Sequence, residues 1–301
     1  MPGPMSGLWR GKGSRELESG LWWRDRLSAG QAEVVRSWLP RSRLLADHSR
    51  DGLDTAVLQV TDGQGTYIVK AAGASSHHIR REIEAHRSWT AVWAHRNRAP
   101  RIVRWDERSN ILMTEYLTGS PVEKGAAEYD PEMYRQAGQL LRAFHDQASR
   151  LDHSYEAAAN TKALSWIRKP HRIPVPLAER AKGILEKTAP EPVTVVPTHG
   201  DWQPRNWLVH GTELRIIDFG RYEFRPAITD FCRLAVQQWR CRPHLEAAFF
   251  EGYGTDIRDQ RLWHISLLRE AVSTAVWAYQ VGDARFEQQG HRMLRDALAN
   301  F

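Results

Sequence analysis

Cysteine is scarce in this chain: Cys232 and Cys241 are the only two among 301 residues. A disulfide framework needs several cysteine pairs, so a small disulfide-stabilised secreted domain is excluded. Free thiols are typical of a reducing compartment, and we therefore expect a cytoplasmic protein.

Long apolar runs are also missing. The longest uncharged apolar stretch, Ala271–Gly282, is well short of the roughly 20 residues that a membrane-spanning helix needs. The N-terminal segment MPGPMSGLWRGKG has no apolar core of the kind found in secretory signals. We expect no signal peptide and no membrane association.

Neither sign of charge dominates. The chain has 42 basic and 36 acidic residues, a formal net charge of +6, and the two signs are interspersed. This pattern favours a mixed, solvated surface and gives no reason to expect a nucleic-acid partner. Residues 1–19 are rich in glycine, serine and charge, so we expect a flexible N-terminus there.

Residues 20–117 have the pattern of a sheet with helices. An amphipathic stretch over 20–39 ends at Pro40. RSRLLAD, TAVLQVTD and TYIVKAA alternate as strands do, with the hairpin signal DGQG at 62–65 between the last two. Residues 77–94 have helical spacing, and RIVRWDE and NILMTEYL predict two more strands.

Residues 118–301 are mainly helical in pattern. TGSPVEKG at 118–125 is a linker by composition, and Pro131 marks the first turn of a helix. Short strands return at TVVPTHG, NWLVHG and ELRIIDFG before the helices that close the chain. The whole chain is therefore expected to be α+β, with one unit over 20–117 and another over 118–301.

Two segments in the second unit carry groups suited to phosphoryl transfer. THGDWQPRNWLV at 198–209 places Asn206 five residues after Asp201, and LRIIDFGRYEF places Asp218 after an apolar strand. Phosphoryl transfer needs hard oxygen ligands for magnesium and one carboxylate near the attacking hydroxyl. Asp201 is the candidate for that carboxylate, and Asn206 and Asp218 are the candidate ligands.

Lys70 lies in the middle of an apolar strand, where a lysine needs an anionic partner. Phosphates and a carboxylate from the following helix would provide one. We choose Glu82 for that carboxylate, with Glu84 as the rival. Two residues apart on a helix, they point to different faces, so only one of them can fit.

These motifs resemble a known family. HGDWQPRN looks like the HGDxxxxN motif of the aminoglycoside phosphotransferase-like kinases, and IIDFGR and IVK are similar to their metal-binding turn and strand-three lysine. The resemblance implies a bilobal protein-kinase-like fold, with an N-terminal antiparallel sheet lobe and a mainly helical C-terminal lobe. It also implies that Asp201 is the catalytic base and that ATP, or alternatively GTP, is bound with Mg²⁺.

The resemblance extends to the other nucleotide contacts. Lys70 corresponds to the lysine on the α- and β-phosphates, Glu82 to its helix partner, and Asn206 and Asp218 to the metal ligands. Met113 is expected at the back of the base pocket. The stretch expected to hydrogen-bond the base through its backbone consists of Thr114, Glu115, Tyr116 and Leu117. One departure is the phosphate loop DHSRDGLDTAV, whose only glycine is Gly52.

The acceptor is expected to be a small molecule. Only RYEFRPAIT separates Gly220 from Asp230, which leaves no room for the long activation segment on which protein kinases dock peptides. An aminoglycoside-like or other antibiotic is the favoured acceptor, which would make the chain a resistance enzyme. A polycation wants an acidic pocket, which acidic residues of the last helices, with arginines interspersed among them, could supply: Asp256, Asp259, Glu270, Asp283 and Glu287. A metabolite kinase acting on a sugar or amino alcohol, and a non-catalytic nucleotide-binding protein, are the alternatives.

Several residues receive structural interpretations. His199 supports the loop, and Asp230 either holds that loop as a buried carboxylate or caps a helix. Arg205 and Arg221 lie beside the reaction centre and contact either phosphate or a carboxylate. Gly252 and Gly254 in FFEGYG are read as a helix end and turn.

Overall fold

The computed structural model describes Trp23, residues 26–50 and residues 54–301. The N-terminal segment expected to be flexible, residues 1–19, lies outside this range, as does Gly52 of the phosphate loop. The chain divides into two compact units, Met1–Thr118 and Gly119–Phe301. Each unit is described by itself.

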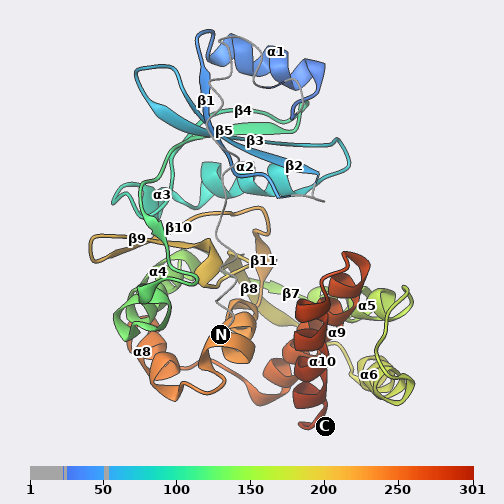
Figure 1. The fold of residues 1–301 in the computed structure, drawn as a ribbon. Coiled ribbons are helices and arrows are strands. Elements are labelled where there is room, and N and C mark those ends of the chain that lie inside the picture. The colour runs from blue at the N-terminus through green and yellow to red at the C-terminus, as the bar shows by residue number, and fades with distance from the viewer. Residues whose placement is uncertain (1–22, 24–25, 51–53) are drawn as a thin grey trace, which may run out of the picture. The chain divides into compact units, whose positions relative to one another are not determined.

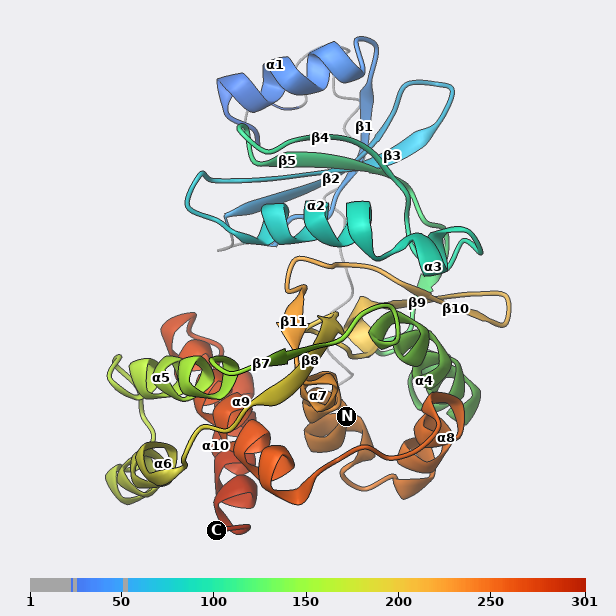
Figure 2. The same cartoon turned by 180° about the vertical axis from the view of Figure 1, so that it is seen from behind.

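The first unit is built on a five-stranded antiparallel sheet in the order β1-β2-β3-β5-β4, with α1 on one face and α2 on the other (Figures 1 and 2). All five strands match segments predicted as strands, three of them from period-two alternation. The elements are α1 (Ala29–Trp38), β1 (Arg43–Asp47), β2 (Thr55–Thr61), β3 (Thr66–Ala72), α2 (His78–Ser88), α3 (Ala91–Ala94), β4 (Ile102–Asp106) and β5 (Ile111–Glu115).

Helix α1 is fixed at its start and along its side by two polar residues. The Ser28 hydroxyl accepts the Gln31 N–H while the Gln31 side chain accepts the Ser28 N–H, a reciprocal cap that satisfies two otherwise unpaired groups. The Gln31 Nε2 also donates to the carbonyls of Ala72 (3.0 Å) and Ser109 (2.9 Å). The helix ends at Trp38, before Pro40, as predicted.

The two faces of β3 are covered by different helices. Val69 and Ala71 belong to the core under α1, and Ala72 belongs to the core under α2. Because side chains alternate along a strand, Lys70 lies on the α2 face. Its register partner on β5 is Leu112, which also packs in the α2 core.

The second unit is mainly helical, with two three-stranded sheets in the orders β10-β9-β6 and β11-β8-β7 (Figure 2). Its strands are β6 (Ser120–Pro121), β7 (Arg150–Asp152), β8 (Val193–Thr198), β9 (Trp207–His210), β10 (Glu213–Ile216) and β11 (Glu223–Arg225). Its α-helices are α4 (Pro131–His145), α5 (Tyr155–Ile167), α6 (Val175–Lys187), α7 (Cys232–Leu234), α8 (Pro243–Tyr253), α9 (Gln260–Gln280) and α10 (Ala284–Leu298). Three 3₁₀ turns, η1 (Ala126–Tyr129), η2 (Pro204–Asn206) and η3 (Ala227–Asp230), and the π-helix η4 (Ala235–Trp239) complete it.

Helices α4 and α8 cross with their backbones in contact. A Cβ on Gly138 would lie 2.1 Å from the carbonyl oxygen of Phe249, and one on Gly252 would lie 1.9 Å from that of Arg135. No side chain fits at either point, so this crossing requires glycine on both helices. Gly252 is the penultimate residue of α8 and Gly254, with φ of 97°, follows its last residue, which agrees with the interpretation of FFEGYG as a helix end; the contact of Gly252 with α4 was not expected from the sequence.

The remaining helices form a second apolar core. Buried side chains of α5, α6, α9 and α10 pack together, with Leu268 and Leu294 fully buried at its centre. Among the described residues, none of the helices combines the length and apolarity that a membrane span requires.

Candidate active site

The loop that follows β8 is held by one buried carboxylate. Asp230 accepts the backbone N–H of His199 (2.8 Å) and of Gly200 (2.7 Å), and its carboxylate lies 3.1 Å from Nε2 of His145. The other nitrogen of His145 lies 2.9 Å from the Tyr253 hydroxyl, which the α4–α8 crossing brings there. Burial raises the pKa of Asp230, but the hydrogen bond and charge of His145 lower it below its usual range. Of the two interpretations of Asp230, the one in which it holds the loop is confirmed.

Gly200 brings a second segment against this loop. Its φ is 79°, in the left-handed region that favours glycine, and a Cβ there would lie 2.2 Å from the carbonyl oxygen of Arg221. The close approach sets Arg221, just after the IDFG sequence, beside the residue that precedes Asp201. The ring of His199 lies 3.2 Å from the Ile217 carbonyl and so supports the same contact.

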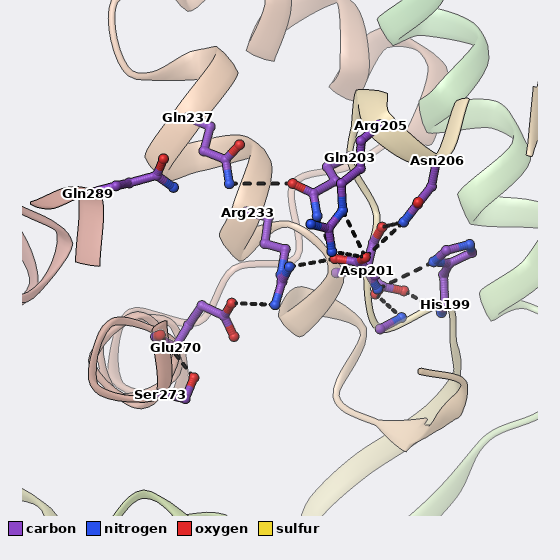
Figure 3. Close-up of polar contacts among 12 residues, drawn as sticks. His199, Asp201, Gln203, Arg205, Asn206, Arg233, Gln237, Glu270, Ser273 and Gln289 are labelled. Carbon is purple, nitrogen blue, oxygen red and sulfur yellow. Dashed lines mark hydrogen bonds and ion pairs between the residues drawn. The ribbon is translucent and has the colours of Figure 1, made fainter. Parts of the chain in front are cut away.

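Asp201 is buried at the centre of a polar cluster (Figure 3). Its Oδ1 accepts from Nε2 of Gln203 and Nη1 of Arg233, both at 2.5 Å. Its Oδ2 accepts from Nη2 of Arg205 (2.5 Å) and Nδ2 of Asn206 (2.9 Å). Four side chains therefore fix the orientation of this carboxylate.

The charges around Asp201 keep it ionised. Burial raises its pKa, but the guanidinium groups of Arg233 and Arg205 lower it well below its usual range, and Arg221 adds to this effect. Arg233 also donates to Glu270 at 2.9 Å and so bridges two carboxylates. The cluster thus contains three arginines and two acids, and it is positively charged overall.

Asn206 and Asp218 come together through the backbone. The Ile217 N–H donates to the Asn206 carbonyl at 3.0 Å, which sets the residue before Asp218 against Asn206. The Nδ2 of Asn206 donates to the carbonyl as well as the carboxylate of Asp201, so its amide oxygen is directed away from that carboxylate. Asp218 is exposed and has φ of 68°, a strained conformation for a residue with a side chain and one often found at functional sites.

These two side chains suit magnesium better than a transition metal. They offer one amide oxygen and one exposed carboxylate, and Mg²⁺ typically takes one or two protein oxygens and completes its shell with phosphates and water. Across the described ranges, no cluster of three or more histidine, cysteine or acidic side chains is placed to hold a metal. Asn206 and Asp218 therefore fit a site that is completed by a ligand.

In the first unit, Lys70 and Glu82 form a buried ion pair. The Lys70 Nζ lies 2.7 Å from Oε1 of Glu82, whereas Glu84 points to solvent. Burial raises the pKa of Glu82, but the charge of Lys70, together with His86, whose Nε2 lies 3.8 Å from Oε1 of Glu82, lowers it to about 2. Glu82 rather than Glu84 is thus the partner of Lys70.

The stretch expected to bind the base occupies β5 and the residues after it. Thr114 pairs with Ile68, which lies two residues from Lys70 on β3, so Thr114 shares the α2 face with Lys70. Met113 is buried in the core under α1, on the opposite face. Its expected position at the back of a pocket next to Lys70 does not agree with this placement, and Leu112 or Thr114 lies on the correct face instead.

After Thr114, some of the backbone N–H groups expected to bind the base already donate hydrogen bonds within the first unit. The N–H groups of Glu115 and Tyr116 donate to the carbonyls of Arg101 and Thr66, both at 2.9 Å. Leu117 is half-buried and follows these pairs.

Two residues of the Asp201 cluster were not identified from the sequence. Gln203 lies inside the HGDxxxxN motif at a position the motif leaves open. Arg233 lies three residues after Asp230 in ITDFCRL, about one helical turn away from it. A basic residue at that spacing is the only sequence signal for it.

The chain was compared with protein families, with curated proteins and with solved structures. Residues 49–264, well over half of the chain, match the phosphotransferase enzyme family. The chain belongs to this family. It is therefore a phosphotransferase that acts on a small-molecule hydroxyl. A comparison with curated proteins found no match.

Solved structures similar to this phosphotransferase confirm its expected fold class. A thermostable variant of an aminoglycoside phosphotransferase, in a complex with ADP and hygromycin B, has 11% identity and a TM-score of 0.64, over 89% of this chain and 97% of its own. Choline kinase LicA from Streptococcus pneumoniae has 14% identity and a TM-score of 0.61, over 91% and 100%. Macrolide 2′-phosphotransferase MphH from Brachybacterium faecium has 17% identity and a TM-score of 0.60, over 89% and 98%.

Proposed function

We propose that this phosphotransferase moves the γ-phosphoryl group of ATP to a hydroxyl of a small molecule, with Asp201 as the base. The observation that carries the proposal is the buried, ionised carboxylate of Asp201 in the same loop as Asn206 and beside the segment that ends in Asp218. GTP is the alternative donor. Similar structures contain ADP, which supports a nucleotide donor.

Phosphoryl transfer does not require Asp201 to be a strong base. The bond from the acceptor oxygen to the γ-phosphorus forms as the bond to the departing ADP oxygen breaks, and the hydroxyl proton passes to Asp201. Because the transition state is loose, the proton leaves late, and a carboxylate of low pKa that orients the hydroxyl is sufficient. Arg205 and Arg233 hold the carboxylate in one orientation for this purpose.

The other predicted residues receive roles consistent with their geometry. Asn206 and Asp218 would hold Mg²⁺, which neutralises charge on the phosphate oxygens when it is bound. Lys70, oriented by Glu82, would contact the α- and β-phosphates. The backbone at 114–117 would contact the base, with Leu112 or Thr114 in the place first expected for Met113.

The acceptor proposed from the sequence is an aminoglycoside-like or other antibiotic, and the alternative is a sugar or amino alcohol metabolite. The acidic residues expected to attract a polycation all have partners in the second unit. Three form ion pairs with arginines: Asp256, Glu270 and Glu287. The other two cap helices α9 and α10: Asp259 and Asp283. This arrangement favours an acceptor that is not a polycation.

The test is transfer by purified protein with ATP and Mg²⁺ against a panel of antibiotics and sugars, followed as ADP release and as mass of the product. Asp201→Asn should lower kcat by about 10²- to 10⁴-fold, the usual contribution of a general base, and leave binding of a non-hydrolysable ATP analogue nearly unchanged. Asp146→Asn, an exposed carboxylate paired with Arg142, is the matched control and should have no effect.

Near wild-type turnover in Asp201→Asn would show that the base is assigned wrongly. Nucleotide binding without transfer to any acceptor would support the non-catalytic alternative. Because Asp201→Asn leaves two arginines without their carboxylate, the urea unfolding midpoint is measured as well, to separate a catalytic loss from a loss of folding.

A further inference from the structure

A basic pocket lies in the second unit, near the loop after β8 that carries Asp201 and is called the catalytic loop below. Its volume is about 320 Å³, and it is lined by residues of η4, the segment after it and α10. Four arginines and one acid contribute its charge: Arg240, Arg242, Arg285, Arg292 and Asp296. Arg240 pairs with Asp296 at 3.2 Å, so three positive charges remain in excess.

One face of α10 supplies two of the four arginines. Arg285, Gln289, Arg292 and Asp296 are spaced by four, three and four residues, which places them on one stripe of the helix. Arg285 and Arg292 are exposed, and no ion pair joins either of them to another residue in the part of the chain that the structure describes. Opposite them, Arg242 lies 4.0 Å from the centre of the Tyr129 ring, which orients it.

The pocket is connected to Asp201 by two hydrogen bonds. Gln237 lines the pocket, and its Nε2 donates to Oε1 of Gln203 at 3.4 Å. Gln203 donates in turn to Asp201 at 2.5 Å. Figure 3 shows Gln237 and Gln289, which come from the two sides of the pocket, on the same side of the catalytic loop. A molecule in contact with Gln237 would therefore lie two hydrogen bonds away from the carboxylate proposed as the base, with Gln203 between them.

The backbone around Gln237 has an uncommon helical form. Residues Ala235–Trp239 form a π-helix, a wider turn that is frequently found at functional sites. Arg233, one turn earlier, contacts Asp201, and Arg240, one turn later, contributes to the pocket. This short segment thus connects the proposed base to the basic pocket.

We propose that this pocket binds an anionic group of the acceptor, and that the acceptor is a small-molecule alcohol carrying a phosphate or carboxylate rather than a polycation. The proposal rests on the proposed function, because it treats Asp201 as the group that receives the hydroxyl proton. Arginines that lack a protein carboxylate are well suited to phosphate and carboxylate, which they contact through two parallel N–H groups. Four arginines from two segments line this one pocket together with Gln237, which a merely solvated helix face would not produce.

The first experiment measures binding of inorganic phosphate by calorimetry, with a non-hydrolysable ATP analogue and Mg²⁺ at saturation to occupy the nucleotide site. Saturable binding is expected for the wild type. The Arg285→Gln/Arg292→Gln variant should bind phosphate at least about tenfold more weakly, since each charged hydrogen bond contributes of that order. Arg295→Gln is the control, because Arg295 is an exposed arginine of α10 that does not line the pocket.

The second experiment compares matched acceptors in the transfer assay: glucose against glucose 6-phosphate, and kanamycin as a polycation. Inorganic phosphate should inhibit transfer in competition with the acceptor and not with ATP, and the double variant should lose this inhibition. Absence of saturable phosphate binding, equal binding in the double variant, or transfer to kanamycin that phosphate does not inhibit would each overturn the proposal. Phosphate binding does not require transfer, so the pocket and the activity that depends on Asp201 can fail separately.

Discussion

The ion pair between Lys70 and Glu82 makes the stability of the first unit depend on pH in a way that one substitution should reverse. The two side chains are 14% and 5% exposed and approach to 2.7 Å. Burial raises the pKa of Glu82, but the charge of Lys70 lowers it from 4.5 to about 2. At about 1.4 kcal/mol per pKa unit, the difference corresponds to roughly 3 kcal/mol of stabilisation at neutral pH.

The sign of the pH dependence follows from this shift. A carboxyl with a lowered pKa in the folded state contributes its full stabilisation above about pH 4.5 and loses it as the pH falls toward about 2. In Lys70→Met, burial remains without its main opposing charge, so the pKa of Glu82 should rise above 4.5. A buried carboxyl with a raised pKa makes the folded state less stable as the pH increases. The unfolded chain then ionises freely, whereas the folded chain must either ionise a buried group or keep its proton at a cost.

The assay is urea unfolding at pH 5 and pH 7.5 of the wild type, Lys70→Met and Lys70→Met/Glu82→Gln. The single variant should lose about 3 kcal/mol at pH 7.5, as expected when one partner of a buried pair is removed, and clearly less at pH 5. The double variant should recover most of the loss and show little dependence on pH. A loss of equal size at both pH values, or no recovery in the double variant, would refute this account of Glu82.

Two further predictions concern the loop segments of the second unit. Asp218→Gly should keep or raise the urea unfolding midpoint, because glycine adopts φ of 68° without strain, and should abolish Mg²⁺-dependent transfer; a lowered midpoint would contradict the strain argument. Gly200→Ala should cost at least about 2 kcal/mol in unfolding free energy and lower kcat, because its Cβ would lie 2.2 Å from the Arg221 carbonyl oxygen. An alanine variant as stable as the wild type would show that the two segments can separate freely.

The strands and the motifs of the chain could be predicted because their signals are local. Period-two alternation identified β1, β2 and β3, RIVRWDE and NILMTEYL were predicted as the other two strands of the first sheet, and the apolar run before Asp218 identified β10. The choice between Glu82 and Glu84 also depended on local geometry, since residues two apart on a helix face different directions. Glu82 faces the sheet and Glu84 faces solvent.

The face of the sheet on which Met113 lies could not be predicted, because no local signal identifies it. Both faces of the first sheet are covered by helices, so Leu112 and Met113 are both buried although they point in opposite directions. When both faces are apolar, alternation no longer shows which face a residue occupies, and an error of one position moves a side chain across the sheet. The register of β5 against Lys70 resolves this, and it is a long-range property.

Contacts between segments that are distant in the sequence could not be predicted either, because they too are long-range properties. Arg233 reaches Asp201 across 32 residues, and the α4–α8 crossing needs Gly138 and Gly252 together. Neither glycine has a positive φ that would mark it locally, and the position of Gly252 near the end of α8 does not indicate its contact with α4. Only the packing of two helices shows why neither residue can carry a side chain.

The distribution of charge is the property that folding changes most, and it bears directly on the acceptor. Along the sequence, the acidic residues of the last helices suggest a trap for a polycation. In the folded second unit, each of those acids is matched by an arginine or by a helix N-terminus, as in Asp256 with Arg258. The excess positive charge then gathers where Arg285 and Arg292 have no acidic partner within the described residues, in a pocket joined to Asp201 through Gln237 and Gln203. The selectivity of the enzyme is therefore expected to follow the arginines that remain unpaired rather than the number of acids, because a paired carboxylate attracts a cationic substrate only weakly.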